Sequence, residues 1–97
     1  MTPPDTLLAA LGSCIGVYIR KYAEGARLDL EKFKITVEAE LSNPKDVPFC
    51  FREIRVLLDF EGVQMEERRR KALLEFIKNC PVHNTLKANP LVEIRVV

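Results

Sequence analysis

The chain has 97 residues, of which 47% are hydrophobic and 30% charged, and its formal net charge is +1. This length predicts one domain over residues 1–97, and the composition excludes an intrinsically disordered chain. The near-zero charge gives no electrostatic reason to expect binding to nucleic acid or to a membrane surface. Three cysteines in a mixed pattern of helices and strands favour reduced thiols in the cytoplasm over a secreted disulfide framework.

A first helix is predicted to begin at Thr2-Pro3-Pro4-Asp5, where Thr2 can cap, proline suits the first turn and Asp5 completes a capping box. It should run to about Ala23, with Gly25 ending it. Residues 11–14, Leu-Gly-Ser-Cys, loosely match a lipoprotein cleavage box. Residues 1–5 contain no basic n-region, however, and no apolar run reaches transmembrane length, so we do not interpret this stretch as a signal segment.

The first half of this helix is apolar on nearly every side, which predicts burial on several sides. Gly12 and Gly16 share one face, where another backbone could approach closely. Tight helix–sheet packing and a helix–helix contact across a dimer both explain this pair of glycines.

Alternating apolar and polar residues predict strands at 33–41 and 54–60. A second helix is expected from about Met65 to Asn79, with the mixed charges of residues 66–71 on its solvated face. Cys80-Pro81 should open a short helix that Asn89-Pro90 ends, and residues 91–97 should form a last strand. The predicted order is α-β-β-α-α-β, an α+β fold with antiparallel strands packed on a buried central helix.

Two cysteines stand in positions where helical geometry bears on thiol chemistry. Cys80 should lie at a helix N-terminus, where free N–H groups and the helix dipole favour a thiolate. Cys14 lies mid-helix in an apolar stretch and would need a cation from elsewhere in the fold. The two residues suggest a redox pair, and the alternative for each is a buried, inert thiol. Cys50 has no comparable setting.

The spacing of Cys80 and His83 also permits a zinc interpretation, with Cys14 as a third ligand. A closed zinc site needs four ligands, or three and a water, and a mid-helix thiol suits that geometry poorly. We therefore expect no metal and no cofactor. His83 is the single histidine, and as a catalytic base it would need its thiol partner within hydrogen-bond reach. A place on the surface of a short helix is the simpler expectation for it.

Residues 3–14 read PPDTLLAALGSC, and this segment resembles the SP-x-E-LLLAALGSC segment of the OsmC/Ohr family. Residues 80–86, CPVHNTL, resemble the second cysteine segment of that family, and residues 92–94 resemble its closing strand. The resemblance covers nearly the whole chain, and both cysteines fall at matching places.

The resemblance implies a cysteine-dependent peroxidase that reduces organic hydroperoxides. Cys14 would attack the peroxide and become a sulfenic acid, and Cys80 would condense with it to a disulfide. An external dithiol would restore both thiols. The family's members are intertwined homodimers with sites at the subunit interface, so a homodimer is expected, with Cys14 and Cys80 close together within a subunit and Cys50 elsewhere.

Two features depart from the family pattern. Family members carry further N-terminal strands that supply an arginine to activate the first cysteine, and this chain starts at the motif, either as a fragment or as a natural short form. Pro4 also stands where the peroxidases have a glutamate, and Asp5 is expected to cap the helix instead. Arg52 and Arg55 could supply a cation, although pairing with acidic neighbours on an exposed strand face is the stronger expectation.

The expected activity is therefore weaker than that of longer family members. The rival hypothesis is a non-enzymatic OsmC-like binding or scaffold protein whose cysteines do not turn over.

Overall fold

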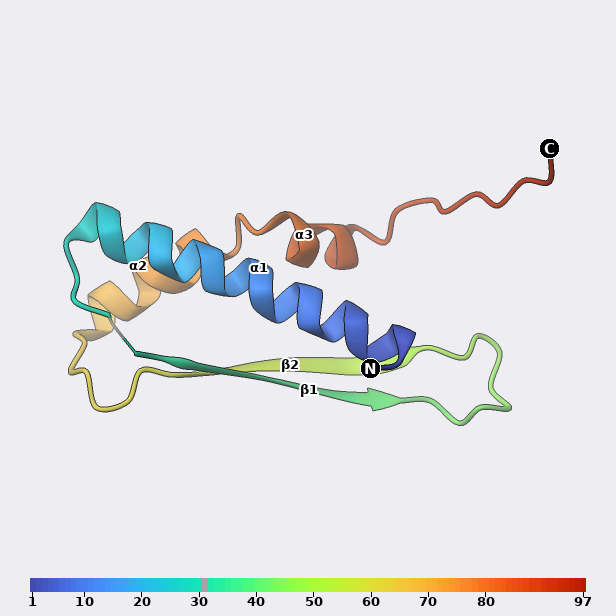
Figure 1. The fold of residues 1–97 in the computed structure, drawn as a ribbon, viewed down its shortest axis with the longest axis horizontal. Coiled ribbons are helices and arrows are strands. Elements are labelled where there is room, and N and C mark those ends of the chain that lie inside the picture. Colours follow the sequence, from blue (N-terminus) through green and yellow to red (C-terminus); the bar gives the residue numbers. More distant parts are fainter. Residues whose placement is uncertain (31) are drawn as a thin grey trace.

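The computed structural model describes residues 1–30 and 32–97. The chain passes through five elements, shown in Figure 1. They are α1 (Pro3–Ala26), β1 (Lys34–Leu41), β2 (Phe51–Asp59), α2 (Glu67–Ile77) and α3 (Pro81–Ala88). The strands form an antiparallel hairpin, and the helices lie together on one face of it (Figure 1).

The first helix begins as predicted, with a complete capping box. The Asp5 backbone N–H donates to Thr2 Oγ1 over 3.3 Å, and the Thr2 N–H donates to Asp5 Oδ2 over 3.4 Å. The predicted end at Gly25 is wrong, because Gly25 lies inside the last turn. The helix ends instead with Arg27 in the left-handed conformation (φ 55°), and the Leu28 N–H donates to the Ala23 carbonyl over 2.8 Å. That bond closes a Schellman-type end, which does not require glycine when its hydrogen bonds are made.

The two predicted strands are confirmed. Val37 lies opposite Val56 and Glu38 opposite Arg55, with an irregularity at the end of β1 between Glu40 and Leu41. Alternate residues pack toward the helices, and these are the apolar ones: Ile35, Val37, Ile54, Val56 and Leu58. The other face of the hairpin carries mostly polar and charged side chains. The alternation of apolar and polar residues in the sequence therefore corresponds to one face covered by the helices and one exposed face.

Helix α1 is the central element, in contact with β1, α2 and α3. Its fully buried residues recur every four positions, at Leu11, Ile15, Ile19 and Ala23. A Cβ added to Gly12 would lie 3.2 Å from Val37 Cγ2, and one added to Gly16 would lie 3.3 Å from Ile35 Cδ1. Of the two explanations for the glycine pair, the structure shows helix–sheet packing.

The predicted second and third helices are both present. Helix α2 is shorter than expected at each end, and its buried residues are Leu73 and Ile77. Helix α3 starts with Cys80 at its N-cap and Pro81 in its first turn, as predicted. It ends at Asn89, which has a left-handed φ of 49° and precedes Pro90.

The predicted last strand at residues 91–97 is wrong for this chain, because these residues form no strand. A strand exists through hydrogen bonds to a neighbouring strand. The segment that follows α3 extends away from the hairpin, so neither described strand lies beside it (Figure 1). The segment keeps strand-like composition, with apolar Val92, Ile94 and Val96 alternating with charged residues.

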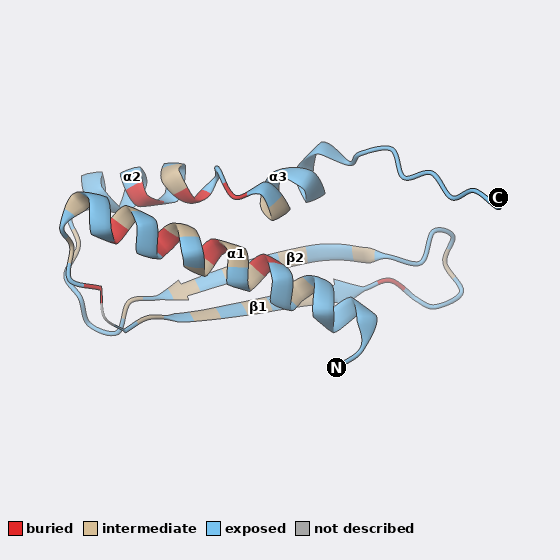
Figure 2. Cartoon of the chain, turned by 45° about the horizontal axis from the view of Figure 1, so that its top comes forward, coloured by how far each residue is buried: buried red, intermediate tan, exposed pale blue. Residues whose placement is uncertain are grey.

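The expected burial of α1 on several sides is also wrong for the single chain. Figure 2 shows buried positions along one side of α1 alone, while most of its first two turns are exposed. Leu7 is 38% exposed and Val17 is 49% exposed. The hairpin covers one side of α1, α2 and α3 cover another, and the remaining side has no cover within the described residues.

No helix within residues 1–30 and 32–97 combines the length and the hydropathy that a transmembrane helix needs.

The glycines of α1 provide a stability test. Gly25 has no atom within 4 Å of an added Cβ, so Gly25→Ala should raise the free energy of unfolding by about 0.5–1 kcal/mol through helix propensity. Gly12→Ala gains the same propensity but pushes against Val37, and it should be at least about 1 kcal/mol less favourable than Gly25→Ala. Chemical denaturation of both variants measures the difference, and equal effects would contradict the close packing of α1 on β1.

Candidate functional site: a thiol pair between two helices

The structure brings Cys14 and Cys80 together where α1 contacts α3. Cys80 is completely buried at the N-cap of α3. Cys14 is half-buried on α1 and packs against the core cluster that contains Cys80. The Cys14 side chain lies close enough to Cys80 to raise the pKa of its thiol, and both cysteines are free thiols.

Burial raises the pKa of the Cys80 thiol, and the neighbouring Cys14 side chain raises that pKa further. The backbone N–H groups of His83 and Val82 act in the opposite direction. The helix N-terminus therefore favours the thiolate as the sequence predicted, but burial outweighs it. The net effect is a raised pKa, so a place at a helix N-terminus does not by itself make Cys80 a reactive thiolate.

The two arginines considered as activating cations are paired with carboxylates at the surface. Arg52 forms an ion pair with Asp46 over 3.0 Å. Arg55 forms ion pairs with Glu53 over 2.7 Å and with Glu38 over 3.5 Å, which raise its pKa. Both belong to exposed positions of β2, outside the apolar face that packs toward α1. The stronger expectation, pairing with acidic neighbours, is confirmed.

His83 is half-buried on α3, and its Nδ1 lies 3.4 Å from Asn84 Oδ1. Its contribution to Cys80 is through the backbone N–H. Within residues 1–30 and 32–97, no three histidine, cysteine or acidic side chains are grouped as a metal site requires. The zinc interpretation of Cys80 and His83 therefore receives no support from the geometry.

The remaining predicted residues serve local structure. Asp5 caps α1, as expected. Cys50 is exposed in the connection between the strands, where its backbone N–H donates to Ser42 Oγ over 3.1 Å. It belongs to neither α1 nor α3, the two helices that carry the thiol pair.

One feature of the site escaped the sequence analysis. An apolar cleft of about 690 Å³ lies between α1, α2 and β2, with His83 of α3 also on its wall. Its apolar lining residues are Ile15, Ile54, Val56, Leu58, Leu74 and Ile77. Ile15 follows Cys14 directly, and Ile77 precedes Cys80 by three residues. The sequence shows that all three elements have apolar faces. It does not show that these faces leave a cleft between them, because that depends on how the elements pack.

These observations define an α+β protein whose central helix holds one thiol against a second, buried thiol at the start of a short helix. The sequence profile of the family described as OsmC-like protein matches residues 1–95. The chain belongs to the OsmC-like protein family.

Individual relatives agree with this assignment. A Mycoplasma genitalium protein named hydroperoxide reductase is 29% identical over 98 residues, which cover 99% of this chain and 69% of that protein. The crystal structure of an OsmC-like protein from Mycoplasma pneumoniae is similar with a TM-score of 0.74 and 28% identity, over 90% of this chain and 62% of that one. That of an organic hydroperoxide resistance protein OsmC from Legionella pneumophila has a TM-score of 0.63 and 22% identity, over 92% of this chain and 64% of that one. This chain therefore spans less than two thirds of these two solved chains.

The raised pKa of Cys80 predicts how stability depends on pH. In the alkaline range above about 8.5, the ordinary thiol pKa, the unfolded chain loses the Cys80 proton while the folded chain retains it. The folded state then holds more protons than the unfolded state, so the free energy of unfolding should fall as pH rises through this range. Cys80→Ala should flatten this slope, and Cys50→Ala should preserve it. Urea denaturation from pH 7 to 10 measures both, and a slope unchanged in Cys80→Ala would contradict the assignment.

Proposed function

We propose that this protein is a thiol-dependent peroxidase that reduces organic hydroperoxides through Cys14 and Cys80. The observation that carries the proposal is the contact between these two thiols across α1 and α3. The similarity to a protein named hydroperoxide reductase supports the reaction class. Cys14 is the nucleophile because it is the less buried of the two thiols, and Cys80 is the resolving thiol.

In the first step, the Cys14 thiolate attacks the terminal oxygen of the hydroperoxide. An S–O bond forms, the O–O bond breaks, and the alkoxide leaves as an alcohol after taking a proton. Cys14 becomes a sulfenic acid and the peroxide is reduced by two electrons. The raised pKa of Cys80 keeps a proton on the neighbouring thiol at this stage, so Cys80 can donate a hydrogen bond to the Cys14 thiolate.

In the second step, Cys80 attacks the sulfenic sulfur of Cys14. An S–S bond forms, the S–O bond breaks, and water leaves with the Cys80 proton. Oxidation removes the negative charge of Cys14, which is one cause of the raised Cys80 pKa, so the first step makes Cys80 easier to deprotonate for the second. An external dithiol then reduces the disulfide with two electrons and two protons.

The apolar cleft supports an organic substrate. At about 690 Å³ it falls in the size range of small-molecule sites, and its walls are mostly aliphatic. Neither cysteine lines the cleft, but its lining residue Ile15 directly follows Cys14 and Ile77 precedes Cys80 by three residues. We assign it to the alkyl part of the hydroperoxide.

We further propose that the active form is a homodimer. The described surface measures 7827 Å², whereas a compact monomer of 11.1 kDa exposes about 5,700 Å². The radius of gyration is 16.1 Å, against about 12.5 Å for a compact chain of this length. The excess area of about 2,100 Å² per chain is of the size that an obligate dimer buries.

Two apolar features identify what a second copy would cover. Leu7, Ala10 and Val17 are exposed and follow helical spacing along the uncovered side of α1. Residues 91–97 form an unpaired segment with strand composition, in which Ile94 is 92% exposed. A second hairpin offers this segment the strand edge that its own chain places on the other side of α1.

A non-enzymatic binding or scaffold role is the second candidate. It is favoured by one observation, namely that the two arginines proposed to activate Cys14 are paired with carboxylates elsewhere. Turnover of an organic hydroperoxide with a dithiol separates the two functions.

Cysteine variants test the assigned roles. Cys14→Ser should abolish reaction with cumene hydroperoxide, whereas Cys80→Ser should retain a single oxidation of Cys14 but lose most turnover, by about 10-fold or more. Cys50→Ser is the matched control and should retain wild-type turnover, because Cys50 lies on neither helix of the pair. Stopped-flow oxidation and a coupled dithiol assay provide the measurements. An unchanged rate in Cys14→Ser would refute the nucleophile, and an unreactive wild-type protein would favour the binding role.

The dimer has its own test. Light scattering should report twice the chain mass at micromolar concentration, and Ile94→Glu should shift the protein toward monomer because it places a charge on the apolar side of the pairing segment. Arg95→Gln changes the alternate, charged side and should leave the dimer intact. A monomeric wild-type protein would contradict the homodimer, and covering segments from a longer chain would then be the alternative. A dimer resistant to Ile94→Glu would contradict the role of residues 91–97.

A further inference from the structure

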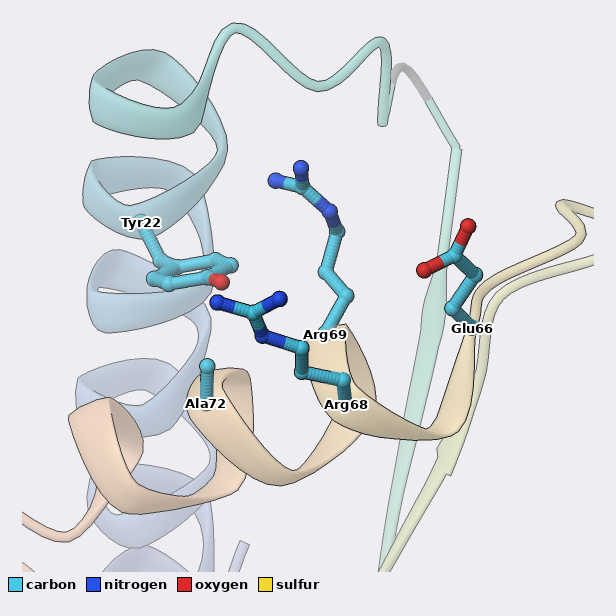
Figure 3. Close-up of a pocket in the computed structure, with 5 residues that line it drawn as sticks. All are labelled: Tyr22, Glu66, Arg68, Arg69 and Ala72. Carbon is cyan, nitrogen blue, oxygen red and sulfur yellow. The ribbon is translucent and has the colours of Figure 1, made fainter.

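A second cavity, of about 340 Å³, lies between α1 and α2, remote from the cysteines along α1. Tyr22, Glu66, Arg68, Arg69 and Ala72 line it. Figure 3 shows both arginine side chains extending from α2 into the space beside α1, with the Arg68 guanidinium near the ring of Tyr22 and the Arg69 guanidinium pointing away from that ring. Tyr22 lies eight residues beyond Cys14, which is about 12 Å along a helix. The cavity is therefore separate from the thiol pair.

The two arginines share this cavity although neighbouring positions on a helix diverge by about 100°. Like charges brought together repel unless an anion offsets them. Among the described side chains, no carboxylate lies within 4.0 Å of either guanidinium, whereas Lys71 and Lys78 on the same helix both have acidic partners. The cavity thus carries two positive charges that form no ion pair among the described residues, with the carboxylate of Glu66 on the opposite wall.

The surroundings supply further donors. Glu66 stands at the N-cap of α2 but makes no capping hydrogen bond, so its side chain leaves the first-turn N–H groups unbonded, while the charges of Glu66 and Glu67 offset part of the helix dipole. Tyr22 is held in position by its contact with Phe76, with ring centroids 5.6 Å apart. Its hydroxyl is a donor that remains in place when the arginines bind a ligand.

We propose that this cavity binds the phosphate group of a small phosphate monoester. A single guanidinium satisfies both oxygens of a planar carboxylate, but two guanidiniums in one cavity match a tetrahedral dianion with three terminal oxygens. Glu66 on the opposite wall can accept a hydrogen bond from a hydroxyl of the ligand's organic part. The site is independent of the cysteine chemistry.

Calorimetry with inorganic phosphate and with glycerol 3-phosphate tests the proposal at fixed ionic strength. The wild-type chain should bind glycerol 3-phosphate saturably and more tightly than inorganic phosphate or acetate. Arg68→Gln and Arg69→Gln should each weaken binding by about 10-fold or more, as expected for loss of charged hydrogen bonds. Arg70→Gln is the matched control: Arg70 lies on the same helix but lines a different cavity, so binding should change less than about 3-fold.

Thermal unfolding checks that the arginine variants remain folded, and Cys14→Ser should bind as the wild type does, which separates this site from the peroxidase proposal. Equal weakening in all three arginine variants would show a general charge effect and overturn the site. So would tighter binding of acetate, absence of saturable binding, or binding to phosphatidic acid vesicles without binding to glycerol 3-phosphate.

Discussion

Close packing of α1 on the hairpin is the constraint on which the rest of the structure depends. Gly12 and Gly16 allow the helix backbone to approach Val37 and Ile35, and the buried side of the helix then fixes where α2 and α3 can lie. Because α1 contacts β1 and both other helices, a change in its position would move every described interaction of the core. Cys14 stands two residues after Gly12, so its placement is set by the same contact.

The thiol pair follows from this arrangement. Helix α3 begins where α2 ends, and Cys80 is the residue between them that turns into the core beside α1. Burial at that junction has a chemical consequence, because it raises the pKa of Cys80 while Cys14 remains half-exposed. The two thiols are thereby made unequal without a metal or a described cation. An attacking and a resolving cysteine need this inequality.

Local signals in the sequence predicted most of the fold. The capping box at Thr2 and Asp5, the period of two in the strands and the proline after Cys80 each carry their own physical cause, and each was found where expected. The prediction of a strand at residues 91–97 failed because a strand needs a neighbouring strand, which composition does not specify. The raised pKa of Cys80 could not be predicted for a similar reason. A helix N-terminus can be read from Pro81, but the depth of burial that outweighs it is set by tertiary packing.

The central claim is that Cys14 and Cys80 form one redox pair within a chain. It is tested most directly by adding one equivalent of cumene hydroperoxide to the reduced protein and mapping disulfides by non-reducing peptide mass spectrometry. The account predicts a Cys14–Cys80 bridge as the main product, with Cys50 still a free thiol, since disulfide formation requires Cα atoms within about 7 Å and the two thiols already interact. Oxidised Cys14 with no bridge, or a bridge that uses Cys50, would contradict it.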